Sequence, residues 1–115
     1  MYHGNFEDQA DMLSRFEVDS ETLKGATVLF AAYDCDYDGE ALVVYRQKRK
    51  LYEVNASHCS CYGLEGQWDP EETSVEALRH RIDKGTLGFM LGGYTADFVA
   101  MLDSLTRKKK VEQSV

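Results

Sequence analysis

The chain has 115 residues, 43% of them hydrophobic, and a single proline. This length and composition predict one folded domain and exclude a multidomain enzyme. The formal net charge of −7 is unevenly spread, because residues 1–40 carry ten acidic and two basic side chains, whereas residues 41–50 carry four basic side chains. An acidic chain is repelled by nucleic acid unless a basic patch dominates locally, so we expect a protein with a basic surface as the partner rather than DNA or RNA.

The composition also bears on the cellular compartment. No apolar run approaches the roughly 20 residues that span a bilayer, and the N-terminus lacks the basic and apolar parts of a signal peptide. Three cysteines are an odd number, which favours free thiols or metal ligands over a disulfide framework. These features predict a cytoplasmic protein with no membrane association.

The N-terminal segment predicts a short helix. Asn5 is a candidate N-cap with Asp8 at the third helical position, and apolar residues follow at helical spacing to about residue 17. Residues 19–24 are polar and end at Gly25, so we expect a connection that contains at most one helical turn.

Three strands are expected next. Residues 26–33 are apolar and nearly continuous, which is typical of a strand buried on both faces. Residues 40–47 and 51–57 form a second pair of candidate strands around the polar turn at 48–50. Because these connections are short, the three strands predict an antiparallel meander.

Two helices are expected in the C-terminal part. The first starts either at Asp69 with Pro70 or at a capping box in residues 73–76, and it ends near Gly85. The second starts at Thr95 and carries a basic cluster, residues 107–110, near its C-terminus, where positive charge is favourable. We therefore predict an α+β fold: a three-stranded antiparallel meander with about three helices packed mainly on one face. The expected parts of this single domain are an N-terminal helix or arm (1–25), the meander with the loop that follows it (26–68), two helices (69–110) and a frayed tail (111–115).

An acidic turn between the first two strands is the first candidate site. Asp34, Asp36 and Asp38, followed by Gly39, match the opening of a calcium-binding EF-hand loop. The match fails at the twelfth position, which is Tyr45 instead of a bidentate Glu, and strands rather than helices flank the turn. We therefore interpret these residues as a solvated hairpin turn that is available to a basic partner.

A second candidate site is rich in cysteine and histidine. Cys35, His58, Cys59 and Cys61 are the ligand types of a structural zinc site, although one residue between Cys59 and Cys61 is fewer than usual. A cysteine nucleophile beside His58 is another reading, but no orienting residue is recognisable. Alternatively, the cysteines pack as small hydrophobic side chains.

Tyr62 and Trp68 flank a loop that contains two glycines. Exposed aromatic residues on such a loop suit a binding surface. Equally, both rings can cover an edge of the core, and the sequence leaves the two readings open.

Residues 51–68, LYEVNASHCSCYGLEGQW, followed by PEET at 70–73, resemble a group of small uncharacterised proteins carried by bacteriophages and prophages. The resemblance covers about residues 26–82 and carries no catalytic residues. It implies a small phage accessory protein, a class that commonly binds and redirects or inhibits host machinery, including defence systems.

These observations favour a non-enzymatic protein that binds a basic host protein. The expected contact residues lie in two segments that a meander brings to one end of the sheet: Asp34, Asp36, Asp38, Glu40, Tyr62, Glu65 and Trp68. One alternative is nucleic-acid mimicry, in which the acidic N-terminal third occupies a basic groove of a host nuclease or surveillance complex. The other is a zinc-binding or cysteine-dependent protein that uses Cys35, His58, Cys59 and Cys61.

Overall fold

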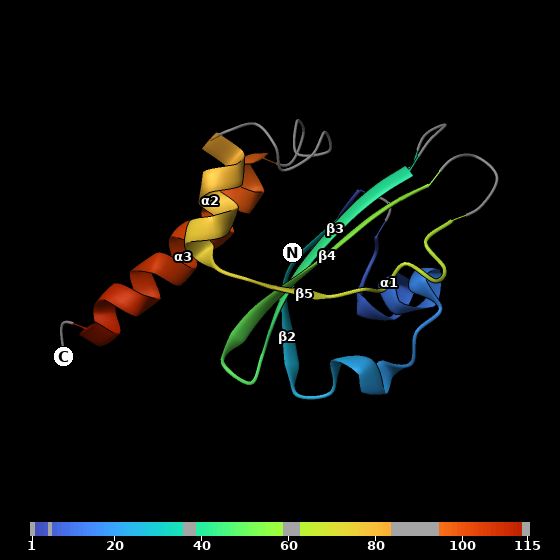
Figure 1. Ribbon diagram of the computed structural model, residues 1–115, viewed down its shortest axis with the longest axis horizontal. Helices are drawn as coiled ribbons and strands as arrows, with labels where there is room; N and C mark the ends of the chain where they lie inside the picture. The colour runs from blue at the N-terminus through green and yellow to red at the C-terminus, as the bar shows by residue number, and fades with distance from the viewer. Residues whose placement is uncertain (1, 5, 36–38, 59–62, 84–94, 114–115) are drawn as a thin grey trace.

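A mixed five-stranded sheet organises the part of the chain that the computed structural model describes, which is residues 2–4, 6–35, 39–58, 63–83 and 95–113 (Figure 1). The strands lie in chain order and comprise β1 (Tyr2–Gly4), β2 (Ala26–Cys35), β3 (Gly39–Gln47), β4 (Lys50–His58) and β5 (Glu71–Thr73). β1 is parallel to β2, and the other neighbours are antiparallel. The α+β class is thereby confirmed.

The predicted meander is present as β2, β3 and β4, but the expectation of only three strands is wrong. β1 and β5 extend the sheet at its two edges, and each has three residues. Strands this short carry too few residues for an alternating pattern, so hydrophobic periodicity could not predict them. Each of them pairs with a longer neighbouring strand, β1 with β2 and β5 with β4.

The turn between β3 and β4 has an unusual backbone. Gln47 pairs with Lys50, so the turn contains only Lys48 and Arg49. Their φ angles are 53° and 67°, the left-handed region that type I′ hairpin turns require at both positions. Asn-Gly is the preferred sequence for such a turn, because branched or long side chains are less stable at positive φ.

The first helix begins later than expected. α1 spans Gln9–Phe16, and the carboxylate of Asp8 accepts a hydrogen bond from the Asp11 N–H at 2.8 Å. Asp8 is therefore the N-cap itself, which corrects the prediction of a cap at Asn5, a residue outside the described part. A 3₁₀ turn, η1 (Ser20–Leu23), confirms the single helical turn expected in the connection to β2.

The other two helices follow β5. α2 spans Val75–Asp83, and Ser74 Oγ accepts a hydrogen bond from the Ala77 N–H at 3.1 Å. The helix therefore starts at the second of the two predicted positions, because residues 71–73 are already engaged in pairing with β4. α3 spans Thr95–Gln113. The expected stop at Gly85 lies outside the described residues. No helix in the described part of the chain is long and apolar enough to cross a bilayer.

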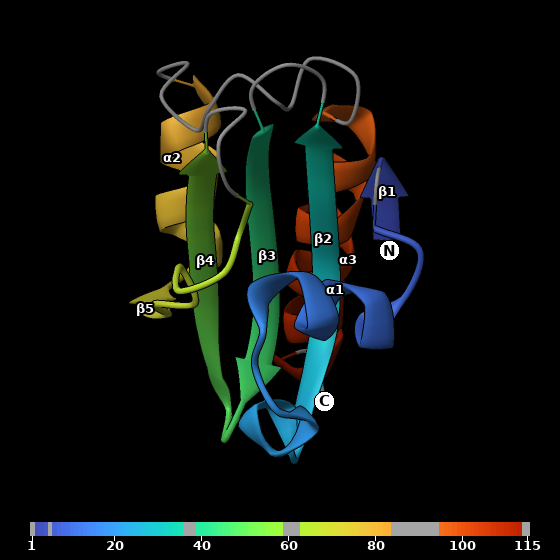
Figure 2. The same cartoon turned by 90° about the vertical axis from the view of Figure 1, so that its right-hand side faces the viewer.

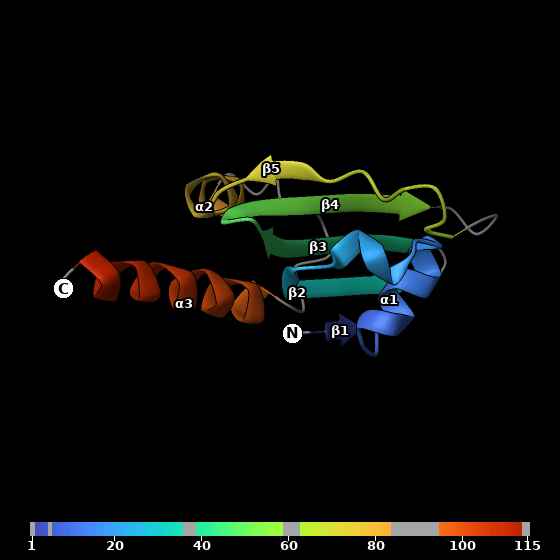
Figure 3. The same cartoon turned by 90° about the horizontal axis from the view of Figure 1, so that it is seen from below.

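Helices cover both faces of the sheet, so the prediction that they pack mainly on one face is wrong (Figures 2 and 3). α1 packs on one face, where Met12, Leu13 and Phe16 join one hydrophobic cluster. α2 and α3 pack on the other, where Phe98 lies edge-on to Phe30 with ring centroids 4.9 Å apart. The reason lies in β2 and β3, which present buried side chains on both faces and must exclude water from both.

We predict that changing the hairpin turn to its preferred sequence stabilises the protein. The double substitution Lys48→Asn and Arg49→Gly should raise the free energy of unfolding by about 1 kcal/mol, because Asn and Gly adopt positive φ with less strain. Urea unfolding measures the change. The control K48Q/R49Q removes the same two charges but not the strain, and an equal gain in that variant would contradict the prediction.

Candidate functional site

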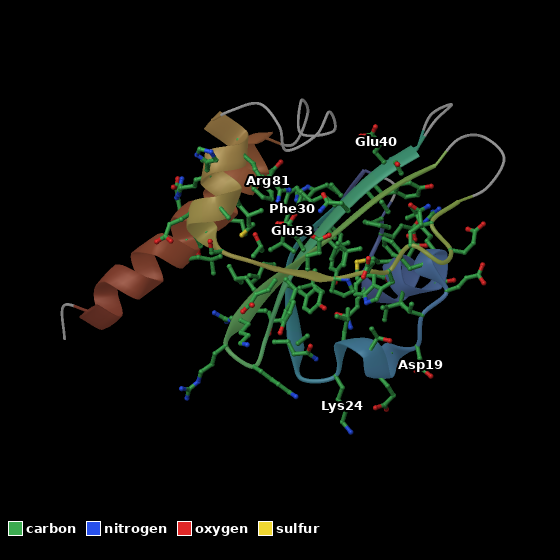
Figure 4. All side chains as sticks on the ribbon, in the orientation of Figure 1. Asp19, Lys24, Phe30, Glu40, Glu53 and Arg81 are labelled. Carbon is green, nitrogen blue, oxygen red and sulfur yellow. The ribbon has the colours of Figure 1, made fainter. Side chains whose placement is uncertain are left out.

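Strand register brings the two predicted site segments to one end of the sheet. Asp34 pairs with Glu40, which in turn pairs with Ser57, and in the next row Cys35 pairs with Gly39, which pairs with His58. The end of β2, the start of β3 and the end of β4 are therefore neighbours, and Figure 4 shows Glu40 at this end. We call it the acidic end, defined by Asp34, Glu40 and the turn between them.

Two acidic residues occupy directly opposed positions in this register. Asp34 lies opposite Glu40 on neighbouring antiparallel strands. Like charges at such positions destabilise a sheet. Asp36 and Asp38 belong to the same turn but lie outside the described residues, so the structure provides the backbone frame of the acidic end rather than its full surface.

The loop that follows β4 folds back along the edge of that strand. The Gln67 side chain accepts a hydrogen bond from the Ser57 N–H at 3.0 Å and donates one to the Gly63 carbonyl at 2.9 Å. Glu65 is exposed and accepts a hydrogen bond from the Gly63 N–H at 3.2 Å. This arrangement covers part of an edge that β5 leaves unpaired, which protects the strand from pairing with other chains.

Trp68 packs against the core instead of extending from the acidic end. Its ring lies edge-on to Phe16 at 5.0 Å and stacks on Tyr45 at 5.9 Å. Tyr45 is five residues along β3 from Glu40, about 17 Å at the rise of a strand. These contacts agree with the interpretation that Trp68 covers an edge of the core. Tyr62 lies outside the described residues.

Burial raises the pKa of Tyr45, with a smaller contribution from Tyr52. The neighbouring Trp68 indole N–H is buried and has no acceptor among the described residues. Tyr45 therefore belongs to a stacked aromatic cluster with Tyr52 and Trp68.

The candidate zinc and thiol residues are only partly placed. Cys35 and His58 share one row of the sheet, with Gly39 between them. Two strand spacings separate their backbones by about 10 Å. Cys59 and Cys61 lie outside the described residues, and within the described ones no three His, Cys, Asp or Glu side chains form a group that could hold a metal ion.

A buried ion pair was missed by sequence reasoning. Glu53 on β4 is only 3% exposed, and its Oε1 accepts hydrogen bonds from Arg81 on α2 at 2.6 Å and from Asn55 at 2.8 Å (Figure 4). Its Oε2 is buried without a hydrogen-bond partner among the described residues. The alternation of β4 placed Glu53 on the face opposite Tyr52 and Val54, but nothing in the sequence indicated that α2 would cover that face.

A pocket of about 530 Å³ lies at the opposite end of the sheet, between the β3–β4 hairpin and the start of α2. Four basic residues line it, Arg46, Arg49, Lys50 and Arg79, around apolar contributions from Leu51, Val75 and Leu105. Two acidic residues, Glu72 and Glu76, complete the charged lining. The local charge is therefore positive in a protein with a net charge of −7.

A smaller hollow of about 360 Å³ lies between β1, β2 and α3. His3 Nδ1 and Asp97 Oδ2 are 4.0 Å apart in its wall. Burial lowers the pKa of His3, and Asp97 partly offsets that effect. Apart from these two residues and Ser104, the hollow is lined by apolar side chains.

We predict that Glu53 and Arg81 stabilise the fold only as a pair. Arg81→Met should lower the free energy of unfolding by about 3 kcal/mol, because it leaves a buried carboxylate without its counter-charge. The double variant E53M/R81M should recover most of this loss, since two apolar side chains then replace both charges. Chemical denaturation of the two variants tests this, and a double variant as unstable as the single one would contradict it.

The candidate binding surfaces are therefore the acidic end and the basic pocket at the opposite end of the sheet. No protein-family model, no curated protein and no solved structure matches the chain.

Proposed function

We propose that the chain is a non-enzymatic binding protein whose acidic end engages lysine and arginine residues of a partner protein. In line with the resemblance to phage proteins, the proposed partner is a bacterial host protein, such as a component of a defence system, that this binding inhibits or redirects. The proposed contacts are made by Asp34, Asp36, Asp38 and Glu40, with Glu65 on the adjoining loop.

The opposed positions of Asp34 and Glu40 are the observation that carries the proposal. Like-charged residues facing each other across two strands destabilise the sheet by a few tenths of a kcal/mol. Local arrangements that reduce stability are characteristic of functional sites, where the gain comes from binding rather than from folding. A basic partner would offset this cost, because positive charge is attracted to the acidic end.

Trp68 has a supporting role in this proposal. Its ring contacts Phe16 and Tyr45, so we propose that it anchors the loop of residues 63–68 to the core and not the partner to the loop. Gln67 then holds the same loop on the end of β4 through Ser57. The binding surface would therefore depend mainly on charge, and association should be fast at low salt and slower at high salt.

Neutralising Asp34 and Glu40 should raise the stability of the protein and abolish binding of the partner. We expect D34N/E40Q to raise the free energy of unfolding by about 0.5 kcal/mol, because the repulsion is removed. The same variant should lose a stoichiometric partner that the wild-type protein retains in affinity capture from nuclease-treated bacterial lysate. Denaturation and mass spectrometry give the two readouts.

The matched control is E17Q/E21Q, which removes two exposed acidic residues from the layer of α1 and η1. This control should retain the partner. Loss of the partner in both variants would show that binding follows total charge and would contradict a site at the acidic end. A stabilised D34N/E40Q variant that still retains the partner would contradict it as well.

Nucleic-acid mimicry is a second proposal, and the N-terminal layer favours it. Glu7, Asp8, Glu17, Asp19 and Glu21 are all exposed there. Its two basic residues are already engaged: Arg15 with Asp11 at 3.1 Å and Lys24 with Glu21 at 3.9 Å. A mimic would bind a basic groove through this layer, so E17Q/E21Q would weaken binding and the affinity would fall steeply with salt.

A zinc-binding or cysteine-dependent protein is the third proposal, favoured by the shared row of Cys35 and His58. It predicts close to one zinc per chain in protein purified without chelators, and loss of that zinc in C59S/C61S. Elemental analysis of both proteins measures this. A wild-type protein that is folded but contains no zinc would contradict the metal site.

A further inference from the structure

Two basic segments that are far apart in the sequence belong to elements that share a pocket at the end of the sheet opposite the acidic end. Arg46, Lys48, Arg49 and Lys50 form the β3–β4 hairpin, and Leu105 of α3 lines the same pocket as three of them. α3 continues beyond Leu105 through residues 107–110, the sequence Arg-Lys-Lys-Lys. Figures 1 and 3 show the hairpin and the C-terminal half of α3 extending from the same end of the molecule. We call this the basic end.

Part of this charge is not neutralised within the protein. Lys50 Nζ lies 3.7 Å from Glu72, and Arg79 lies 2.6 Å from Asp103. Arg46 and Arg49 have no ion-pair partner among the described residues, and Arg49 is exposed. The basic end therefore has arginine side chains available for an anionic ligand, positioned beside a pocket.

The backbone conformation of the hairpin turn also supports a binding role for these cations. Lys48 and Arg49 both have positive φ, where Asn-Gly would be more stable. Strained backbone of this kind persists mainly where the residue has another role. Two long cationic side chains at the tip of a hairpin extend the positive surface beyond the pocket, which Asn-Gly could not do.

The geometry points to binding of the phosphate backbone of duplex nucleic acid at the basic end. Duplex DNA carries one negative charge per about 1.7 Å of its axis, which suits the closely spaced cations of the hairpin, and the sequence of α3 adds four more basic residues at 107–110. None of the described residues that line the pocket is aromatic, whereas single strands are usually bound by stacking on aromatic rings. Val111 is the only apolar residue in α3 after Leu105, so the sequence of this part of the helix has no apolar stripe of the kind that a membrane-surface helix needs.

The net charge of −7 does not oppose this binding strongly. The eight steps from Gly39 to Gln47 along β3 separate the two ends by about 27 Å. The Debye length is about 10 Å at 0.1 M salt, so the acidic end is largely screened from a ligand at the basic end. A locally basic patch is the condition under which an acidic chain can bind nucleic acid.

Fluorescence anisotropy with a labelled DNA duplex of arbitrary sequence, at about 50 mM and about 200 mM salt, tests the inference. We expect the full chain to bind, and R46Q/R49Q to weaken binding by about tenfold at the lower salt concentration. In a plot of log K against log salt, the slope should become shallower by about 2, because two phosphate contacts are lost. R49K should restore binding relative to R49Q, since it keeps the charge.

Lys24→Gln is the matched control for R49Q, because Lys24 is also an exposed cation but lies in the connection between η1 and β2. K24Q should leave duplex binding unchanged. D34N/E40Q should also leave it unchanged, so a failure of the duplex-binding inference can be distinguished from a failure of the proposed partner site. Urea unfolding checks that every variant is folded. The inference is overturned if the duplex is not bound, if K24Q and R49Q weaken binding equally, or if single strands or anionic lipid vesicles are bound in preference to the duplex.

Discussion

A sheet with two apolar faces is the constraint on which the rest of this structure depends. Leu42 and Val44 of β3 are fully buried on one side of the sheet, while Val43 and Tyr45 are buried on the other. Neither face can remain in water, so each needs its own covering layer. α1 supplies one layer and α2 with α3 supplies the other, and this requirement fixes where the helices lie relative to the strands.

The contact between β4 and α2 adds an electrostatic condition to that packing. The Glu53 carboxylate is buried under α2 and is compensated by Arg81 at 2.6 Å. A buried charge pair contributes little net stability compared with apolar side chains, but removing one partner is strongly unfavourable. The docked position of α2 satisfies this condition, because it brings Arg81 to the buried Glu53 carboxylate. The start of α2 at Ser74 then brings the helix beside the β3–β4 hairpin and forms the wall of the basic pocket.

Both turns of the meander depart from what folding alone would select. At one end Asp34 faces Glu40, a pair of like charges, and at the other end Lys48 and Arg49 adopt positive φ. Disagreement between local preference and the overall fold is expected at functional positions. Because an antiparallel meander places successive turns at opposite ends of the sheet, the acidic and basic segments of the sequence are held apart and not allowed to neutralise each other.

The sequence by itself determined the α+β class, the β2–β3–β4 meander and the presence of the helices, because each of these has a periodic pattern or a candidate capping residue within a short window. It did not determine the start of α1, where the cap is Asp8 and not Asn5. It also determined that the acidic turn and the end of β4 would be neighbours, since short connections leave a meander few alternatives. Only the tertiary structure decided the edge strands β1 and β5, the burial of Glu53 beneath Arg81 and the packing of Trp68 on Tyr45. It likewise decided that the hairpin cations share a pocket with Leu105 of α3. The physical reason is that these features join residues distant in the chain, and local propensity carries no information about which distant partner completes a pair, covers a face or shares a pocket.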